Sequence, residues 1–279
     1  MATQRLAMHL DHVCLESEDP KALAAFYGQA AKMDVVERGG GIWTCEAEGR
    51  RMMFTKGRNR GIGFGAYAFD DAAALGAYRA RLADHGFNVE PASSSWFGEG
   101  AFAIRDPDGN RLEFGVSPAQ KTGPAQTSEA RLQHFVIATD QCRSMRDFYV
   151  DILGFQIADE VYRDDGEVTA AFLNSDDEHH AFAVFQAPEK RFDHQAFEVR
   201  DWNDIRDWAD HLSDMGILID WGPGRHGIGN NLFIMIADPD GNWFEYSAEI
   251  ENLAPDRAPG RWKHEPHTLN LWGQAVMRS

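Results

Sequence analysis

Two histidines and one glutamate in the second half of the sequence carry side chains that could together bind one divalent metal ion. His134 and His194 each lie in an apolar segment typical of a β-strand, and Glu245 lies in a third such segment. Two neutral imidazoles and one carboxylate leave several coordination positions of a divalent iron open, which suits the activation of oxygen and a second substrate together. The alternative interpretation is that both histidines are ordinary strand residues and the glutamate is a surface carboxylate.

The spacing of residues around His134 repeats earlier in the chain. His12 follows Leu10-Asp11, and the pair Phe26-Tyr27 begins 14 residues after this histidine. His134 follows Leu132-Gln133, and the pair Phe148-Tyr149 begins 14 residues after it. An internal repeat of this kind indicates a tandem duplication.

A second repeated motif supports the duplication and shows that the first copy is incomplete. The sequence Asp-Pro-Asp-Gly-Asn begins at Asp106 and again at Asp238, and Glu113 and Glu245 each follow the glycine of their copy by four residues. At the repeat position of His194, however, the first half carries Phe64. The sequence therefore predicts a complete metal site in the second half alone.

Each half is predicted to contain short strands and two helices in the order β-α-β-β-β, twice over. Helices are expected to begin near Asp19-Pro20 and Asp140 and to cover 71–85 and 201–215, and strands to cover 42–46, 52–55, 65–69, 169–173, 181–185 and 195–199. This pattern predicts an α+β fold with mixed sheets around a C-terminal metal site. The expected domains are 1–118 and 129–250, joined by a polar linker over 117–128, with a tail over 251–279.

Composition narrows the classes of function. The 279-residue chain has a formal net charge of −17, which disfavours binding to nucleic acid and to anionic membranes. The sequence has no uncharged apolar run of transmembrane length and no apolar stretch of signal-peptide length near its start. Its three cysteines form neither a disulfide framework nor a zinc motif. We therefore expect a cytoplasmic protein.

Together with the repeat, three short motifs carry a resemblance to a known family. They are His180-Ala-Phe-Ala-Val184, Gly222-Pro-Gly-Arg-His226-Gly, and Asp238-Pro-Asp-Gly-Asn followed by Glu245. The chain resembles the vicinal oxygen chelate (glyoxalase–bleomycin resistance) superfamily over roughly residues 8–248. Its two-domain arrangement resembles the type I extradiol ring-cleaving catechol dioxygenases. The resemblance implies two tandem vicinal oxygen chelate domains, each a pair of βαβββ modules or one duplicated module.

This resemblance also implies a cofactor and a role for each site residue. His134, His194 and Glu245 would hold Fe(II), with Mn(II) as the alternative, and O2 would be the co-substrate. His180 would perform acid–base catalysis, because an imidazole titrates near neutral pH. His226 would donate a hydrogen bond to the substrate or to oxygen. The implied reaction is the insertion of O2 into a catecholic ring next to the vicinal diol.

Two positions depart from the family pattern. Met235 stands where many extradiol dioxygenases have a tyrosine, and methionine cannot donate a hydrogen bond. Trp221 stands where relatives acting on carboxylated catechols can have an arginine. The implied substrate is therefore an apolar or substituted catechol from aromatic-compound degradation. The sequence leaves open which catechol this is, which ring bond is cleaved, which metal is bound, what replaces the tyrosine, and the oligomeric state.

Two other classes of function remain as alternatives. One is a metal-dependent isomerase, lyase or hydrolase of the same superfamily, and the other is a metal-free ligand-binding module of that fold. The tail, which contains Trp262 and Trp272, is expected to pack near the pocket or at a subunit interface of a homo-oligomer. His179 is expected to face solvent because it neighbours His180 in an alternating segment.

Overall fold

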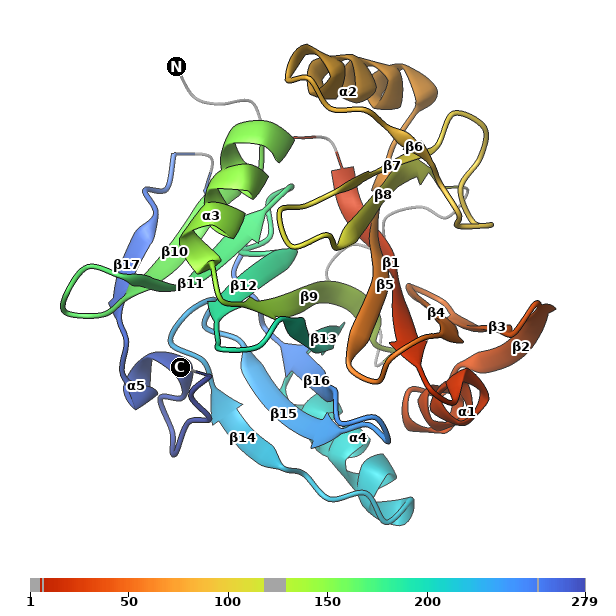
Figure 1. Ribbon diagram of the computed structural model, residues 1–279. Coiled ribbons are helices and arrows are strands. Elements are labelled where there is room, and N and C mark those ends of the chain that lie inside the picture. The colour runs from red at the N-terminus through yellow and green to blue at the C-terminus, as the bar shows by residue number, and fades with distance from the viewer. Residues whose placement is uncertain (1–5, 7, 118–128, 255, 279) are drawn as a thin grey trace.

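The computed structural model describes residues 6, 8–117, 129–254 and 256–278, and each half of the chain builds one mixed β-sheet with helices packed against it (Figure 1). The strand order is β2-β3-β4-β1-β5-β8-β7-β6 in the first sheet and β14-β15-β16-β13-β9-β12-β11-β10-β17 in the second. The predicted α+β class is confirmed. Most of the predicted linker, residues 118–128, lies outside the described residues.

The first half consists of two βαβββ modules in succession. The first module contains β1 (Met8–Ser17), α1 (Pro20–Ala30), β2 (Asp34–Gly39), β3 (Ile42–Ala47) and β4 (Arg50–Lys56), and the second contains β5 (Gly61–Phe69), α2 (Ala72–Asp84), β6 (Glu90–Pro91), β7 (Phe102–Arg105) and β8 (Arg111–Val116). Strand β2 is absent from the sequence-based prediction, because all six of its residues are exposed and it has no alternating apolar face.

The second half has the same order of elements. Its modules contain β9 (Arg131–Thr139), α3 (Cys142–Asp147), β10 (Gln156–Tyr162), β11 (Val168–Asn174) and β12 (Phe182–Gln186), then β13 (Arg191–Val199), α4 (Trp202–Asp214), β14 (Trp221–Arg225), β15 (Leu232–Ala237) and β16 (Trp243–Ala248). Helix α3 continues into the π-helix η1 (Phe148–Leu153). Each half is thus a pair of βαβββ modules, which settles the choice that the sequence left open.

The described part of the tail attaches to the edge of the second sheet. It forms β17 (Gly260–Lys263), which pairs in parallel with β10, and the short helix α5 (Pro266–Leu269). Figure 1 shows β17 running along β10, with α5 next to the C-terminus. None of the helices within the described ranges is long and apolar enough to cross a membrane.

The two repeated motifs meet across the halves of the molecule. The Tyr27 hydroxyl donates to Asp238 Oδ2 at 3.2 Å, and the Tyr149 hydroxyl donates to Asp106 Oδ2 at 3.4 Å. All four side chains are buried. The tyrosine of each half therefore bonds to the Asp-Pro-Asp-Gly-Asn turn of the other half, and both motifs serve to join the two halves.

Strand register places the three predicted ligands on one face of the second sheet. In the central strand β13, Ala196 pairs with His134 of β9 on one side and with Glu245 of β16 on the other. Directly paired residues point to the same face, and His194 shares that face because it lies two residues from Ala196. Three adjacent strands thus bring His134, His194 and Glu245 together.

Candidate metal centre

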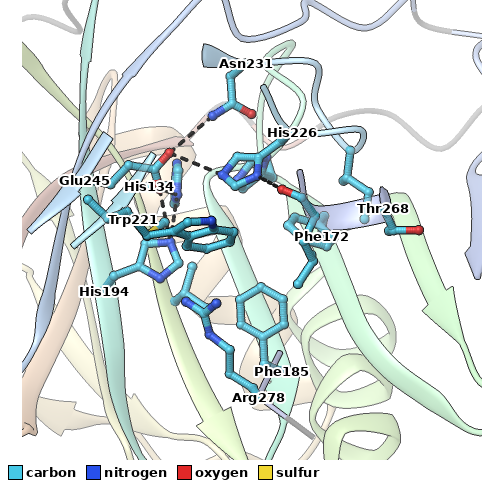
Figure 2. A pocket seen from close by; sticks show the side chains of 15 residues that line it. His134, Phe172, Phe185, His194, Trp221, His226, Asn231, Glu245, Thr268 and Arg278 are labelled. Atoms are coloured by element: carbon cyan, nitrogen blue, oxygen red, sulfur yellow. Dashed lines mark hydrogen bonds and ion pairs between the residues drawn. The ribbon is translucent and has the colours of Figure 1, made fainter. Parts of the chain in front are cut away.

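The three predicted ligands form a compact buried cluster. The Nε2 atoms of His134 and His194 lie 3.3 Å apart, and they lie 3.6 and 3.4 Å from Glu245 Oε2. Within the described ranges, these residues form the one group of three His, Cys, Asp or Glu side chains whose ligand atoms all lie within 4.8 Å of one another. Figure 2 shows the three side chains converging on one point. The geometry is that of a site that could hold a metal ion.

The residue before each histidine fixes the orientation of its ring. Gln133 Oε1 accepts a hydrogen bond from His134 Nδ1, and Asp193 Oδ1 accepts one from His194 Nδ1 at 2.8 Å. Because an amide or carboxylate oxygen can only accept, the proton of each neutral imidazole is on Nδ1 and the lone pair of Nε2 faces the cluster. This is the tautomer that a metal ligand requires.

The charges in the cluster also favour a cation. Glu245 is 1% exposed, and no Lys or Arg of the described residues forms an ion pair with it. Burial raises the pKa of Glu245, but the adjacent imidazoles of His134, His194 and His226 outweigh burial and hold the pKa well below its usual value. A buried carboxylate without a fixed cation is unfavourable, and a divalent ion bound between Glu245 and the imidazoles would compensate its charge.

All seven residues predicted from the sequence line a single pocket of about 410 Å³. They are His134, His180, His194, Trp221, His226, Met235 and Glu245. The remaining wall is mostly apolar and aromatic, with Val136, Phe172, Phe185, Ile228 and Leu269. The pocket therefore offers a metal-binding end and an apolar body, as expected for a ring-shaped ligand.

His180 lies directly beside the cluster. Its ring centroid is 4.3 Å from that of His134, and the side chain is buried. Burial lowers the pKa of His180 well below its usual value, and the neighbouring His134 and His179 lower it further. His180 is consequently a neutral imidazole that can accept a proton.

His226 faces the cluster from the loop after β14. Its ring stacks on Phe233 at 3.9 Å between centroids, and Nδ1 donates to the backbone carbonyl of Leu269 in the tail. Its Nε2 atom lies 3.7 Å from Glu245 Oε1. Because the carbonyl keeps the proton on Nδ1, neutral His226 is an acceptor at Nε2, and it can donate there only as an imidazolium.

Trp221 and Met235 form the apolar wall nearest to the carboxylate ligand. Met235 pairs with Glu245 on one side and with Trp221 on the other. Both side chains pack with Phe233, and the Trp221 indole donates to the Gln274 carbonyl at 2.9 Å. The indole has its one donor satisfied by the tail, so it presents only apolar surface to the pocket.

The tail contributes a pocket residue that sequence reasoning missed. The Arg278 guanidinium donates to Asp193 Oδ1 at 2.8 Å, and it lies 5.3 Å from the Phe185 ring and 5.4 Å from the Trp221 ring. In the view of Figure 2, the Arg278 guanidinium lies between the rings of His194 and Phe185. No periodicity in the tail could have revealed this contact, which depends on the chain folding back over the sheet.

Replacing Arg278 with Ala is expected to lower the melting temperature by several degrees and to raise KM. The change removes one partner of a buried ion pair, leaving Asp193 with Arg191 at 2.7 Å as its remaining cation. It also opens the wall over Phe185. Thermal unfolding of the metal-loaded protein and steady-state kinetics measure both effects, and Arg278→Lys should recover part of each. An unchanged melting temperature in Arg278→Ala would contradict this role for the ion pair.

The structure contradicts the expectation that His179 faces solvent. Its side chain is 0% exposed, because the segment before β12 turns inward and does not alternate as a strand. His179 Nδ1 lies 3.0 Å from His180 Nδ1, on the side of the His180 ring opposite to Nε2.

In the first half, the corresponding position is filled by protein. Phe64 pairs with Cys14 as His194 pairs with Val136, which confirms that Phe64 is the counterpart of His194. His12 Nε2, the atom that would face a metal, lies 2.7 Å from Ser94 Oγ. The Glu113 carboxylate accepts from the backbone N–H groups of Ser93 and Ser94, both at 2.9 Å.

Both halves of the chain match one protein family. The model of the Glyoxalase/Bleomycin resistance protein/Dioxygenase superfamily matches residues 9–114 and 131–246, one segment in each half. The chain belongs to this superfamily. Its two matched segments coincide with the two sheets, so the resemblance stated from sequence motifs is confirmed at the level of the superfamily.

Curated relatives of the chain are named metapyrocatechase or diol dioxygenase. The chain is 29% identical to Metapyrocatechase 2 of Cupriavidus necator over 196 residues, which are 61% of this chain and 60% of that protein. It is 26% identical to Biphenyl-2,3-diol 1,2-dioxygenase of Paraburkholderia xenovorans over 269 residues, covering 88% of this chain and 89% of that protein. The first match thus spans less than two thirds of its relative.

A solved superfamily structure with a different activity is also similar. The Mn(II)-bound glyoxalase from Novosphingobium aromaticivorans shares 25% sequence identity with a TM-score of 0.80, covering 98% of this chain and 93% of that one. The superfamily fold alone therefore does not distinguish ring cleavage from other metal-dependent reactions.

Proposed function

We propose that this protein is a non-haem Fe(II)-dependent extradiol dioxygenase that inserts O2 into a catecholic ring next to the vicinal diol. The observation that carries the proposal is the cluster of His134, His194 and Glu245 at the end of an apolar pocket that also contains His180. The two curated relatives support it, because one is named a metapyrocatechase and the other a dioxygenase of an aromatic diol.

The donor set fits a catalytic metal better than a structural one. Three protein ligands leave positions open, whereas a structural zinc site is closed by four. Fe(II) suits the set best, and Mn(II) is the alternative. When bound, such an ion supplies Lewis acidity towards the two diol oxygens and a path for electrons from the ring to O2.

The residues of the chain supply proton transfer and orientation. Neutral His180 would take a proton from one substrate hydroxyl and return it as an acid later in the reaction. His226, fixed by the Leu269 carbonyl, would accept a hydrogen bond from the substrate at Nε2. The donor role that the family resemblance implies for His226 would require a proton on Nε2.

The pocket wall favours an apolar or substituted catechol over a charged one. Trp221, Met235 and Phe185 offer aromatic and thioether surface. Arg278 is the cation at this wall, and its charge is paired with Asp193. We infer that a ring substituent lies against Trp221 and Met235.

Replacing Met235 with Tyr is expected to lower kcat/KM for a bulky substituted catechol more than for catechol itself. The new ring and hydroxyl would occupy the space of the substituent, and the hydroxyl would need a partner in an apolar wall. Steady-state kinetics of wild type and Met235→Tyr on both substrates measure the difference. A variant that improves on both substrates would show that Met235 is a catalytic deficit and does not set specificity.

The test of the proposed function is anaerobic loading with Fe(II), followed by a panel of catechols. The expected result is stoichiometric O2 uptake and the yellow ring-fission chromophore, neither of which should appear with metal-free protein. A protein that binds iron but consumes no O2 with any catechol would contradict the dioxygenase assignment. A protein that binds no metal would favour the ligand-binding module.

A second candidate is a metal-dependent isomerase or lyase, which the similarity to the Mn(II)-bound glyoxalase favours. Such an enzyme would turn over without O2 when loaded with Mn(II). Anaerobic assays with that metal distinguish the two candidates. We further propose a cytoplasmic, homo-oligomeric enzyme of aromatic-compound degradation with domains 1–118 and 129–250 and a tail over 251–279, and gel filtration tests the oligomeric state.

A further inference from the structure

A chain of three buried polar side chains leads from the second sheet to the pocket. Asp159 of β10 lies behind His179, and His179 lies behind His180. The exposed fractions are 1%, 0% and 3%. His179 Nε2 is 3.2 Å from Asp159 Oδ2, and it has no hydrogen bond to another group of the described residues. Asp159 is therefore the polar group that His179 Nε2 faces.

The negative charge of Asp159 is fixed by its other contacts. Arg257 and the backbone N–H of Gly260 donate to Oδ1 at 2.8 and 2.9 Å, and the Trp262 indole donates to Oδ2 at 2.7 Å. Burial raises the pKa of Asp159, but His179, Arg257 and Trp262 outweigh burial and lower the pKa to about 2. The carboxylate facing His179 is thus an acceptor without a proton of its own.

Because the Asp159 carboxylate can only accept, it determines which nitrogen atoms of His179 and His180 carry a proton. In the singly protonated ring of His179 the proton belongs on Nε2, because a lone pair there would face the Asp159 carboxylate. The Nδ1 atom of His179 then carries a lone pair, and at 3.0 Å it can only accept from His180 Nδ1. With its proton on Nδ1, His180 has an unprotonated Nε2, and its side chain lines the pocket.

We propose that Asp159 and His179 are positioning residues that hold His180 in the Nδ1–H tautomer, so that its Nε2 atom is free to accept a proton from the substrate. This inference rests on the proposed acid–base role of His180. The same logic applies wherever a carboxylate fixes the tautomer of a catalytic imidazole. It also gives the tail a role in the site, since β17 and its flanking residues bind the carboxylate.

Three variants separate positioning from packing. His179→Leu keeps an apolar side chain in the space but removes the acceptor for His180 Nδ1–H. His179→Asn places an amide oxygen near the position of Nδ1, where it can still accept. Asp159→Asn offers an amide N–H to His179 Nε2, which would place the His179 proton on Nδ1 and drive the His180 proton to Nε2.

The first measurement is the nitrogen-15 NMR spectrum of His180 in the full chain, both metal-free and loaded with diamagnetic Zn(II). We expect the Nδ1–H tautomer in wild type and His179→Asn, and an increased Nε2–H population in His179→Leu and Asp159→Asn. Arg257→Gln is the structural control, because it removes the ion pair between the tail and Asp159 Oδ1 but leaves Oδ2, the oxygen that faces His179. It should lower the melting temperature without changing the tautomer.

The second measurement is the separation of kcat from KM with a catechol substrate. His179→Leu and Asp159→Asn should lose about 10–100-fold in kcat with KM nearly unchanged, and His179→Asn should recover most of the loss. An Nε2–H tautomer in wild-type His180, or equal losses in the Leu and Asn variants of His179, would overturn the proposal. The tautomer is measured without substrate, so a failure of the dioxygenase assignment would leave that result standing.

Discussion

Replacing His194 with Ala is expected to abolish both metal binding and catalytic activity. His194 lies in the central strand of the three that form the cluster, and its Nε2 atom is within 3.4 Å of both other ligand atoms. Removing it leaves His134 and Glu245, and two ligands hold a divalent iron weakly. Metal analysis after dialysis should show far less than one ion per chain, whereas wild type should retain one ion per chain. O2 uptake by the variant should fall to background.

The matched control is His12→Ala, which removes the counterpart of His134 in the first half. His12 Nε2 already has a partner in Ser94 Oγ, and Phe64 occupies the place of a third ligand. The variant should keep one metal ion per chain, although it loses a buried side chain and should melt at a lower temperature. Stoichiometric metal in His194→Ala, or loss of metal in His12→Ala, would contradict the assignment of the site.

The cluster could be predicted from the sequence because the duplicated halves have the same strand register. Ala66 pairs with both His12 and Glu113, just as Ala196 pairs with both His134 and Glu245. Equal spacing in the two copies therefore implied equal placement in space. Comparing two copies thus identifies which residues share a position in the sheet, and a single copy allows no such comparison.

Contacts made by non-repeated segments could not be predicted in this way. Arg278 and Trp262 come from the tail, which has no counterpart in the first half and no apolar periodicity. His179 was misplaced because the rule of alternation was applied before β12 begins at Phe182. In both cases the position depends on tertiary packing, which local pattern does not encode.

The residue type directly before a strand histidine is a local signal for the orientation of its ring. The residue before each of three strand histidines, Asp11, Gln133 and Asp193, accepts a hydrogen bond from Nδ1 of that histidine. An acceptor directly before a histidine can thus fix its tautomer within a single strand. The same local arrangement serves two histidines of the cluster and one in the half where Phe64 replaces a ligand, so it reports ring orientation and not metal binding.

Replacing His180 with Phe is expected to slow turnover by about 10²–10⁴-fold while metal binding is retained, which is the range for a positioned proton donor or acceptor. The ring of His180 contacts His134, but none of the three cluster distances involves it. Phenylalanine preserves an aromatic contact at this place and removes both nitrogen atoms. Metal analysis, substrate binding under anaerobic conditions and single-turnover rates separate these steps.

The companion variant is His226→Phe, which removes the other pocket imidazole outside the metal cluster. Neutral His226 has its proton on Nδ1 towards Leu269, so its loss should weaken substrate binding more than it slows proton transfer. If His180→Phe turned over at the wild-type rate while His226→Phe did not, the acid–base role would belong to His226. The difference between the two has a structural cause, because only His180 has its second nitrogen backed by an imidazole and a buried carboxylate. The Nδ1 atom of His226 is held by the Leu269 carbonyl, which is not titratable and can share no proton or charge. The rate loss in His180→Phe should therefore be larger than that in His226→Phe.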